Sequence, residues 1–473
     1  MLFNSVPFLF FFPIVTLLFF LTPQRFKWSL LLIASCFFYM FFKPEYILIL
    51  LFTILIDFFS GIYLEKIHEP SKRKIFLISS IVANMGVLAV FKYYNFLNDN
   101  ITGIAHMFGF TNHIPYLKMI LPIGLSFHTF QAMSYTIEVY RGHQKAERHF
   151  GIYSLYVMFY PQLVAGPIER PQNLLHQFRE KKYFSYENAV LGLNLIAYGL
   201  FKKMVIADRL GVYVDQVYSD IGNANTMSAI IAVIFYSFQI YCDFSGYSDI
   251  ARGCAKFMGY DLMYNFNRPY LSKSVSEFWT RWHISLSTWF KDYVYIPLGG
   301  NRVSTSLWYR NLLIVFLLSG LWHGAKWTFI FWGALHGFYL LFGIITKKLR
   351  AKIKSVLIPA KWTGISIFVN RIIVFALVSI AWIFFRAPDF ITALKVLQKI
   401  RECNFTFNLP QLCGEKGPLN LMLSVAVIIT LFLSYYLPRD MKLKYSAAFL
   451  TITTFLIIIL GKDVSNEFIY FQF

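Results

Sequence analysis

The stretch S-G-L-W-H-G-A-K-W, residues 319–327, places His323 between two strongly apolar runs of sequence. A titratable ring is costly to hold at membrane depth, so such a residue is rare and indicates a function. An imidazole is suited to removing a proton from a reacting hydroxyl near neutral pH. We therefore expect His323 to act as a general base. The competing interpretation is a helix end whose histidine only hydrogen-bonds a neighbouring helix.

A second candidate, His283, lies in the stretch E-F-W-T-R-W-H-I-S-L-S-T-W-F-K-D-Y-V-Y-I-P-L-G-G-N-R, residues 277–302. Aromatic residues recur there at every third or fourth position, which predicts an amphipathic helix that continues to Pro297. Glu277 and Arg281 are spaced for an ion pair on its polar side. An interfacial helix with a belt of tryptophans explains most of these residues. His283 is the exception, because it adjoins the aromatic stripe, and it remains a candidate for the reaction.

Polar side chains gather in a third stretch, Q-I-Y-C-D-F-S-G-Y-S-D-I-A-R-G, residues 239–253. At membrane depth such groups must satisfy one another or line a wet cavity. Asp249 and Arg252, three residues apart, are expected to pair. For the other polar residues the pattern leaves structural contacts and tunnel lining equally open; they are Gln239, Asp243, Ser245 and Ser248.

His336 follows His323 by thirteen residues and also precedes a glycine. On one continuous helix this separation means roughly 20 Å of rise and a rotation of about 220°, so the two rings would not reach the same atom. We therefore expect His336 to be structural or part of a tunnel wall. Residues 160–171 contain three prolines and predict a rigid, non-helical passage, which a membrane protein tolerates only inside the protein or beside a cavity.

The elements that must position these residues are membrane helices. The 473-residue chain is 57% hydrophobic and only 14% charged, whereas a soluble protein has about 25% charged residues. The apolar segments predict an all-α polytopic fold of about eleven transmembrane helices, with the shortest segments re-entrant or interfacial. The sequence contains no GxSxG, HExxH, Walker or GxGxxG motif, which argues against a serine hydrolase, a zinc protease or an NTPase. No metal site is expected.

Basic residues fall in alternate short loops, at residues 25–27, 66–74 and 141–148. The positive-inside rule then places the N-terminus outside and these loops in the cytoplasm. They explain much of the net charge of +20, and the same cations are suited to a donor that carries phosphates. Cys403 and Cys413 share a late loop; the odd number of cysteines favours free thiols over a disulfide.

The hydrophobic pattern predicts one membrane domain in three parts. Residues 1–110 are expected to be scaffold helices, residues 115–345 a catalytic core that holds the polar motifs, and residues 346–473 further apolar helices. We find no internal sequence repeat that relates one half of the chain to the other, whereas many transporter folds contain such a repeat.

The motifs at 277–302 and 319–337, together with Y-C-D-F-S-G-Y-S-D-I-A and V-A-G-P-I-E-R-P, resemble those of membrane-bound O-acyltransferases, and most closely their bacterial alginate O-acetylation branch. The resemblance spans nearly the whole chain and implies helices around a tunnel. His323 matches the family's near-invariant histidine, and His283 matches the preceding conserved position. We expect the tunnel to be lined by Trp322, Trp282, Ser287, Gln239, Asp243, Ser245, Asp249 and His336.

The resemblance implies transfer of an acyl group, most often acetyl, across a bacterial inner membrane to an extracytoplasmic polysaccharide such as alginate. Acetyl-CoA or another acyl thioester is the expected donor substrate, and no tightly bound cofactor is expected. A periplasmic SGNH-esterase-like protein and the machinery of polysaccharide synthesis are the expected partners. Two alternatives stay open: D-alanyl or peptidoglycan-type acyl transfer, and a non-catalytic polysaccharide transporter or flippase.

Overall fold

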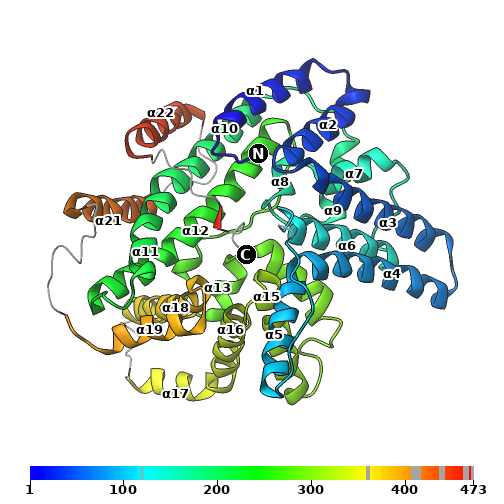
Figure 1. Ribbon diagram of the computed structural model, residues 1–473. Helices are drawn as coiled ribbons and strands as arrows, with labels where there is room; N and C mark the ends of the chain where they lie inside the picture. Colours follow the sequence, from blue (N-terminus) through cyan, green and yellow to red (C-terminus); the bar gives the residue numbers. More distant parts are fainter. Residues whose placement is uncertain (119–120, 358–362, 406–416, 436–442, 462–467, 470–473) are drawn as a thin grey trace. The chain divides into compact units, whose positions relative to one another are not determined.

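The computed structural model describes residues 1–118, 121–357, 363–405, 417–435, 443–461 and 468–469. Within these ranges all regular structure is helical and no strand occurs (Figure 1). Seven of the described helical segments are long and apolar enough to cross a membrane, and two shorter apolar helices accompany them. The predicted all-α polytopic fold is confirmed, whereas the number of about eleven crossings, estimated from helix length, stays a prediction. Cys413 lies outside the described residues.

The chain divides into two compact units. The first unit comprises Met1–Leu200, Tyr247–Met263 and Met441–Thr454, and the second comprises Phe201–Gly246, Tyr264–Asp440 and Phe455–Phe473. Two helices, α12 (Thr226–Phe257) and α22 (Leu443–Leu460), contribute residues to both. The predicted three-part division of the sequence is not tested by these bounds.

Besides three short 3-10 helices, the described residues of the first unit contain ten further α-helices and one π-helical turn. They are α1 (Val6–Leu21), α2 (Lys27–Met40), α3 (Ile47–Lys66), α4 (Pro70–Leu88), the π-helix Ala89–Tyr93, α5 (Tyr94–Met107), α6 (Leu125–Arg141), α7 (Phe150–Met158), α8 (Tyr160–Leu163), α9 (Pro171–Leu174) and α10 (Tyr186–Leu200). The passage predicted at 160–171 is helical only at its two ends, over α8 and the first residue of α9, and is irregular between them.

A buried carboxylate joins three helices of the first unit. Asp57 on α3 accepts hydrogen bonds from Ser80 Oγ and Asn84 Nδ2 on α4, the second at 2.8 Å, and from Thr136 Oγ1 on α6 at 2.8 Å. All four side chains are completely buried. Buried polar groups that satisfy one another in this way hold apolar helices in one fixed register.

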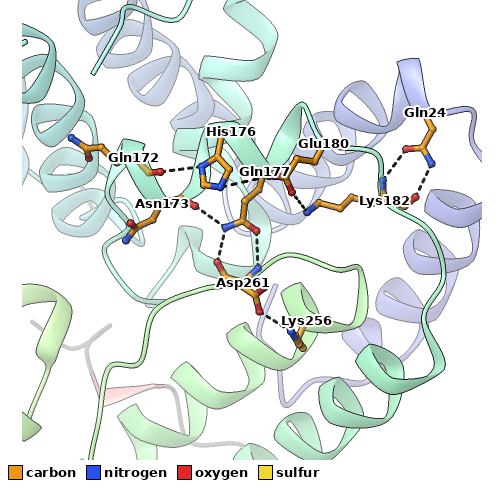
Figure 2. A network of polar contacts seen from close by, with 9 residues as sticks. All are labelled: Gln24, Gln172, Asn173, His176, Gln177, Glu180, Lys182, Lys256 and Asp261. Atoms are coloured by element: carbon orange, nitrogen blue, oxygen red, sulfur yellow. Dashed lines mark hydrogen bonds and ion pairs between the residues drawn. The ribbon is translucent and has the colours of Figure 1, made fainter. Parts of the chain in front are cut away.

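A second polar network of the first unit lies on residues 172–182, which include the end of α9 and the short 3-10 helix His176–Phe178. Figure 2 shows that Gln177 exchanges hydrogen bonds with the backbone of Asp261, at 2.9 and 2.8 Å, and that Lys182 does the same with the Gln24 side chain, at 2.7 and 3.1 Å. Lys182 also bonds Glu180, and this ammonium group lowers the pKa of that carboxyl. These bonds connect residues 172–182 to Gln24, which directly precedes the basic residues at 25–27.

The second unit begins with the π-helix Phe201–Ala207. It continues with α11 (Asp208–Ser219), α13 (Val275–Arg281), α14 (Ile284–Phe290), the π-helix Lys291–Tyr295, α15 (Thr305–His323), α16 (Trp327–Ile345), α17 (Lys347–Leu357), α18 (Thr363–Arg386), α19 (Phe390–Arg401) and α21 (Gly417–Ser434). In Figure 1 the helices α13 to α16 follow one another from green to yellow-green.

Helices α15 and α16 form a hairpin whose backbones nearly touch. A methyl group on Gly320 would lie 2.3 Å from the Phe329 carbonyl oxygen, and one on Gly333 would lie 2.2 Å from the Phe316 carbonyl oxygen. Small residues at such crossings let membrane helices approach closely. Any side chain at Gly320 or Gly333 would therefore separate the two helices and displace His323, the last residue of α15.

Candidate active site

His283 lies at a sharp break between two short helices. α13 ends at Arg281 and α14 begins at Ile284, while His283 has a φ of 42°, in the left-handed region that side-chain-bearing residues rarely adopt. The prediction of one continuous amphipathic helix from residue 277 to Pro297 is therefore wrong. The predicted ion pair survives the break, because Glu277 and Arg281 both belong to α13 and lie 2.7 Å apart.

Asn265 is the physical reason for this break. In a continuous helix the N–H groups of Ile284 and Ser285 would bond to carbonyls four residues earlier. Here the Ile284 N–H donates to the Asn265 backbone carbonyl at 2.9 Å, and the Ser285 N–H donates to the Asn265 side-chain oxygen at 3.2 Å. These bonds compensate for the left-handed backbone at His283 and end the first helix there.

His323 is the last residue of α15 and is almost completely buried. The chain leaves the helix at Gly324, which is extended, and resumes as α16 at Trp327. His323 and His336 therefore lie on two helices of a hairpin and not on one continuous helix. The distance and rotation between them that were calculated for one helix do not apply.

The structure brings His283 and His323 together. Their ring centroids lie 6.4 Å apart, with the ring planes inclined at 62°. Trp322 contacts both rings, at 5.0 Å from His323 and 6.1 Å from His283. Three further rings complete an aromatic enclosure around the pair: Trp332 and Phe385 lie 5.0 and 5.3 Å from His323, and Phe244 lies 4.6 Å from His283.

Trp282 and Ser287, two of the predicted lining residues, are linked to each other. The Ser287 hydroxyl donates to the Trp282 carbonyl at 3.2 Å. The Trp282 ring is fully buried and lies 5.0 Å from the Trp382 ring, which stacks on Trp332 at 5.5 Å. Trp282 is thus connected to the aromatic enclosure through one intervening ring.

His336, on α16, has a hydrogen-bond partner of its own. The indole N–H of Trp279 donates to its Nδ1 at 3.3 Å, and the ring is completely buried. The Trp332 ring lies 5.1 Å from His336 and 5.0 Å from His323, so one indole contacts both histidines. The structural or wall role expected for His336 stays a prediction, and this geometry is consistent with it.

Asp243 and Ser245, on α12, meet two buried lysines of the second unit. Lys203 pairs with Asp243 at 2.7 Å and with Asp208 at 2.9 Å, while Lys202 donates to the Ser245 hydroxyl at 3.0 Å. A buried ion pair is tolerated only where further hydrogen bonds satisfy its charges. The polar residues predicted here are therefore anchored by lysines that lie about 40 residues earlier in the sequence.

A further partner of Asp243 comes from much later in the chain. The N–H of Ile469 donates to its second carboxylate oxygen at 2.7 Å, across 226 residues of sequence. The neighbouring Phe468 ring lies 5.7 Å from Phe244, the ring that contacts His283 edge-on. The segment Phe468–Ile469 is thus buried one ring away from His283.

The remaining predicted lining residues are placed as follows. Asp249 belongs to the first unit, where it pairs with Arg252 at 3.7 Å, as their spacing predicts. Gln239 is half-buried on α12, in the part that belongs to the second unit. A lining role for either residue stays a prediction. Sequence reasoning missed several residues around the histidines: Asn265, Phe244, Trp332, Phe385, Lys203 and Phe468–Ile469.

Comparison with known proteins identifies the family of the chain. Residues 149–387 match the model of MBOAT, the membrane-bound O-acyltransferase family, and this region contains both histidines. The chain belongs to the membrane-bound O-acyltransferase family and is an O-acyltransferase.

Three relatives illustrate the range of this similarity. The probable alginate O-acetylase AlgI of Pseudomonas aeruginosa is 38% identical, over 92% of this chain and 80% of its own. The peptidoglycan O-acetyltransferase of Helicobacter pylori is 36% identical, over 84% of this chain and 79% of its own. The teichoic acid D-alanyltransferase of Bacillus subtilis is 28% identical over only 54% of this chain and 66% of its own.

Proposed function

We propose that the chain transfers an acetyl group from a cytoplasmic thioester, most simply acetyl-CoA, toward an extracytoplasmic polysaccharide such as alginate. The observation that carries this proposal is the pair His283–His323, whose ring centroids lie 6.4 Å apart inside an aromatic enclosure. Relatives named for alginate and peptidoglycan O-acetylation align over most of the chain, which supports acetyl as the acyl group.

In the proposed step, His323 takes the proton of an acceptor hydroxyl. The hydroxyl oxygen bonds to the thioester carbonyl carbon, the C–S bond breaks, and the leaving thiolate takes the proton back from His323. General-base catalysis of this kind contributes about 10² to 10⁴ in rate. The surrounding rings exclude water, which would otherwise hydrolyse the thioester. His283 positions one of the two substrates beside His323.

We place this reaction at a bacterial inner membrane with the N-terminus extracytoplasmic, because the basic loops alternate along the sequence. The lysine and arginine side chains of these loops then lie on the cytoplasmic side, from which a phosphate-bearing thioester arrives. A periplasmic SGNH-esterase-like partner and the polysaccharide synthesis machinery would use the acetyl group. Cysteine labelling at Arg73 and Arg148 tests the orientation; labelling of both positions from outside intact cells would contradict it.

The activity itself is tested with purified protein in liposomes and acetyl-CoA labelled in its acetyl group. With the periplasmic partner supplied, we expect labelled acetyl on that partner or on a polysaccharide acceptor with the wild-type chain, and none with His323→Ala. Equal transfer by both proteins would contradict the proposed role of His323. Failure of the wild type with acetyl-CoA and with an acetylated carrier protein would contradict the donor class.

One alternative acyl group, D-alanyl, is supported by a specific observation, the similarity to a teichoic acid D-alanyltransferase. Mass spectrometry of the group added to the cell envelope separates an acetyl from a D-alanyl product by mass. The shorter and weaker alignment to that relative favours acetyl. Membership of an acyltransferase family removes the expectation of a non-catalytic transporter.

A further inference from the structure

Asn265 makes polar contacts with the turn that carries His283. Its side chain is 2% exposed, and its Oδ1 accepts from the Ser285 N–H at 3.2 Å and from the Ser285 hydroxyl at 2.9 Å. The same atom lies 3.1 Å from His283 Nδ1. Because a backbone N–H only donates, the amide atom that faces it must be the oxygen and not the nitrogen.

This assignment fixes the proton on His283. An amide oxygen only accepts, so the hydrogen of the 3.1 Å contact must be on Nδ1. The ring is completely buried against Phe244, Phe266 and Trp322, surroundings that favour its neutral form. A neutral ring that carries its hydrogen on Nδ1 keeps a lone pair on Nε2.

We infer that Asn265 is a positioning residue that holds His283 as its Nδ1–H tautomer, so that Nε2 accepts a hydrogen bond from a substrate O–H or N–H. This inference rests on the proposed function and sharpens it. A neutral ring with a lone pair on Nε2 orients a donor group of the substrate and does not stabilise negative charge on the thioester oxygen. The group is a hydroxyl of the acceptor sugar or an amide N–H of the thioester's carrier arm.

The tautomer is measured directly by ¹⁵N NMR of the full chain with labelled histidine rings. The signals of His283 are those that His283→Ala removes. We expect a protonated Nδ1 and an unprotonated Nε2 in the wild type, and loss of this pattern in Asn265→Ala. A protonated Nε2 in the wild type would overturn the inference, whatever activity the protein has.

Activity provides the second readout. Asn265→Ala removes the acceptor, and a misplaced tautomer costs about 10⁴ in kcat in a serine protease triad, so we expect a loss of about 10² to 10⁴. Asn265→Asp keeps an oxygen that accepts from Nδ1–H and should retain more activity than Asn265→Ala. The comparison variant is Ser285→Ala, which removes another hydrogen bond to the same oxygen and a longer contact of 3.5 Å with His283 Nδ1. It keeps the accepting oxygen of Asn265, so its loss of activity should be much smaller than that of Asn265→Ala.

The kinetic constants distinguish the two sources of the hydrogen bond. A rise in KM for acetyl-CoA in Asn265→Ala indicates the carrier arm, whereas a rise in KM for the polysaccharide indicates the sugar hydroxyl. An equal loss in Ser285→Ala and Asn265→Ala would overturn the inference, because the oxygen would then serve the turn and not the ring. A wild type with Nδ1–H but no acyl transfer would overturn the proposed function and leave the tautomer assignment intact.

Discussion

Two buried polar centres of this chain are satisfied in opposite ways. In the first unit, Asp57 accepts hydrogen bonds from Ser80, Asn84 and Thr136, so its carboxylate is bonded to two neighbouring helices. In the second unit, His283 and His323 are surrounded mainly by aromatic rings. Intramembrane polar residues are functional candidates by default. The comparison indicates that the bonded carboxylate joins helices, whereas the two adjacent histidine rings inside the aromatic enclosure are the proposed site of chemistry.

The largest effect should follow from His323→Ala. The change removes the proposed general base while the small alanine is tolerated at the end of α15, so we expect acyl transfer to fall about 10² to 10⁴-fold with normal insertion. The measurement is acetyl content of the secreted polymer, normalised to membrane protein level. Near-normal acetylation in a strain that carries only this variant would remove His323 from the mechanism.

His283→Ala should come next, with severe loss of transfer at near-normal expression, because a positioning hydrogen bond to the substrate disappears. His283→Asn should retain more activity than His283→Ala, since an amide also offers hydrogen-bonding atoms. The same normalised acetyl assay compares the two variants. Equal activity of the alanine variant and the wild type would show that the pair works through His323 alone.

Asp57→Ala should act on stability and not on chemistry. It leaves the donors of Ser80, Asn84 and Thr136 without their acceptor, at about 1–3 kcal/mol for each unsatisfied group. Thermal unfolding in detergent should therefore shift down, with Asp57→Asn, which keeps one acceptor oxygen, in between. Activity per folded molecule should stay unchanged. An inactive but fully stable variant would contradict the purely structural role of Asp57.

A smaller effect is expected from Ile469→Pro. Proline lacks the N–H that Asp243 accepts, and a hydrogen bond to a charged group contributes about 1.5–3 kcal/mol. We expect a lower unfolding temperature and a several-fold loss of transfer, because Phe468 then packs less firmly against Phe244. Ile469→Val keeps the N–H and is the matched control. If both variants behave like the wild type, the segment does not support the site.

The smallest effect should be that of His336→Ala. Its ring bonds the Trp279 indole and not His323, so activity should fall only in proportion to lost protein. Transfer normalised to membrane protein level measures this. A completely inactive His336→Ala at full expression, alongside an active His283→Ala, would reverse the assignment of the histidines.

Local patterns sufficed for the fold class and for the two histidine motifs. Apolar runs predict membrane helices because each run satisfies its own backbone, and His323 was recognisable because apolar residues flank it on both sides. The spacing of Glu277 and Arg281 and that of Asp249 and Arg252 also predicted their ion pairs, since partners on one helix turn are neighbours in sequence.

Periodicity failed where a distant residue overrides it. The aromatic spacing continues through His283, but Asn265, 18 residues earlier, captures the N–H groups that would have extended the helix. Likewise, no pattern within 239–253 indicates that Asp243 bonds Lys203 and Ile469. Such contacts are set by tertiary packing, and one sequence contains no local signal for them.

The burial of Phe468–Ile469 beside Phe244 has a consequence for biosynthesis. The helices that carry His283 and His323 are translated and inserted long before residue 469 leaves the ribosome. Until then the carboxylate oxygen of Asp243 lacks the hydrogen bond from the Ile469 N–H, and the Phe244 ring lacks its contact with Phe468. A chain shortened by a premature stop codon before residue 468 would therefore enter the membrane with both histidines present but without the contacts that Phe468 and Ile469 make with Phe244 and Asp243.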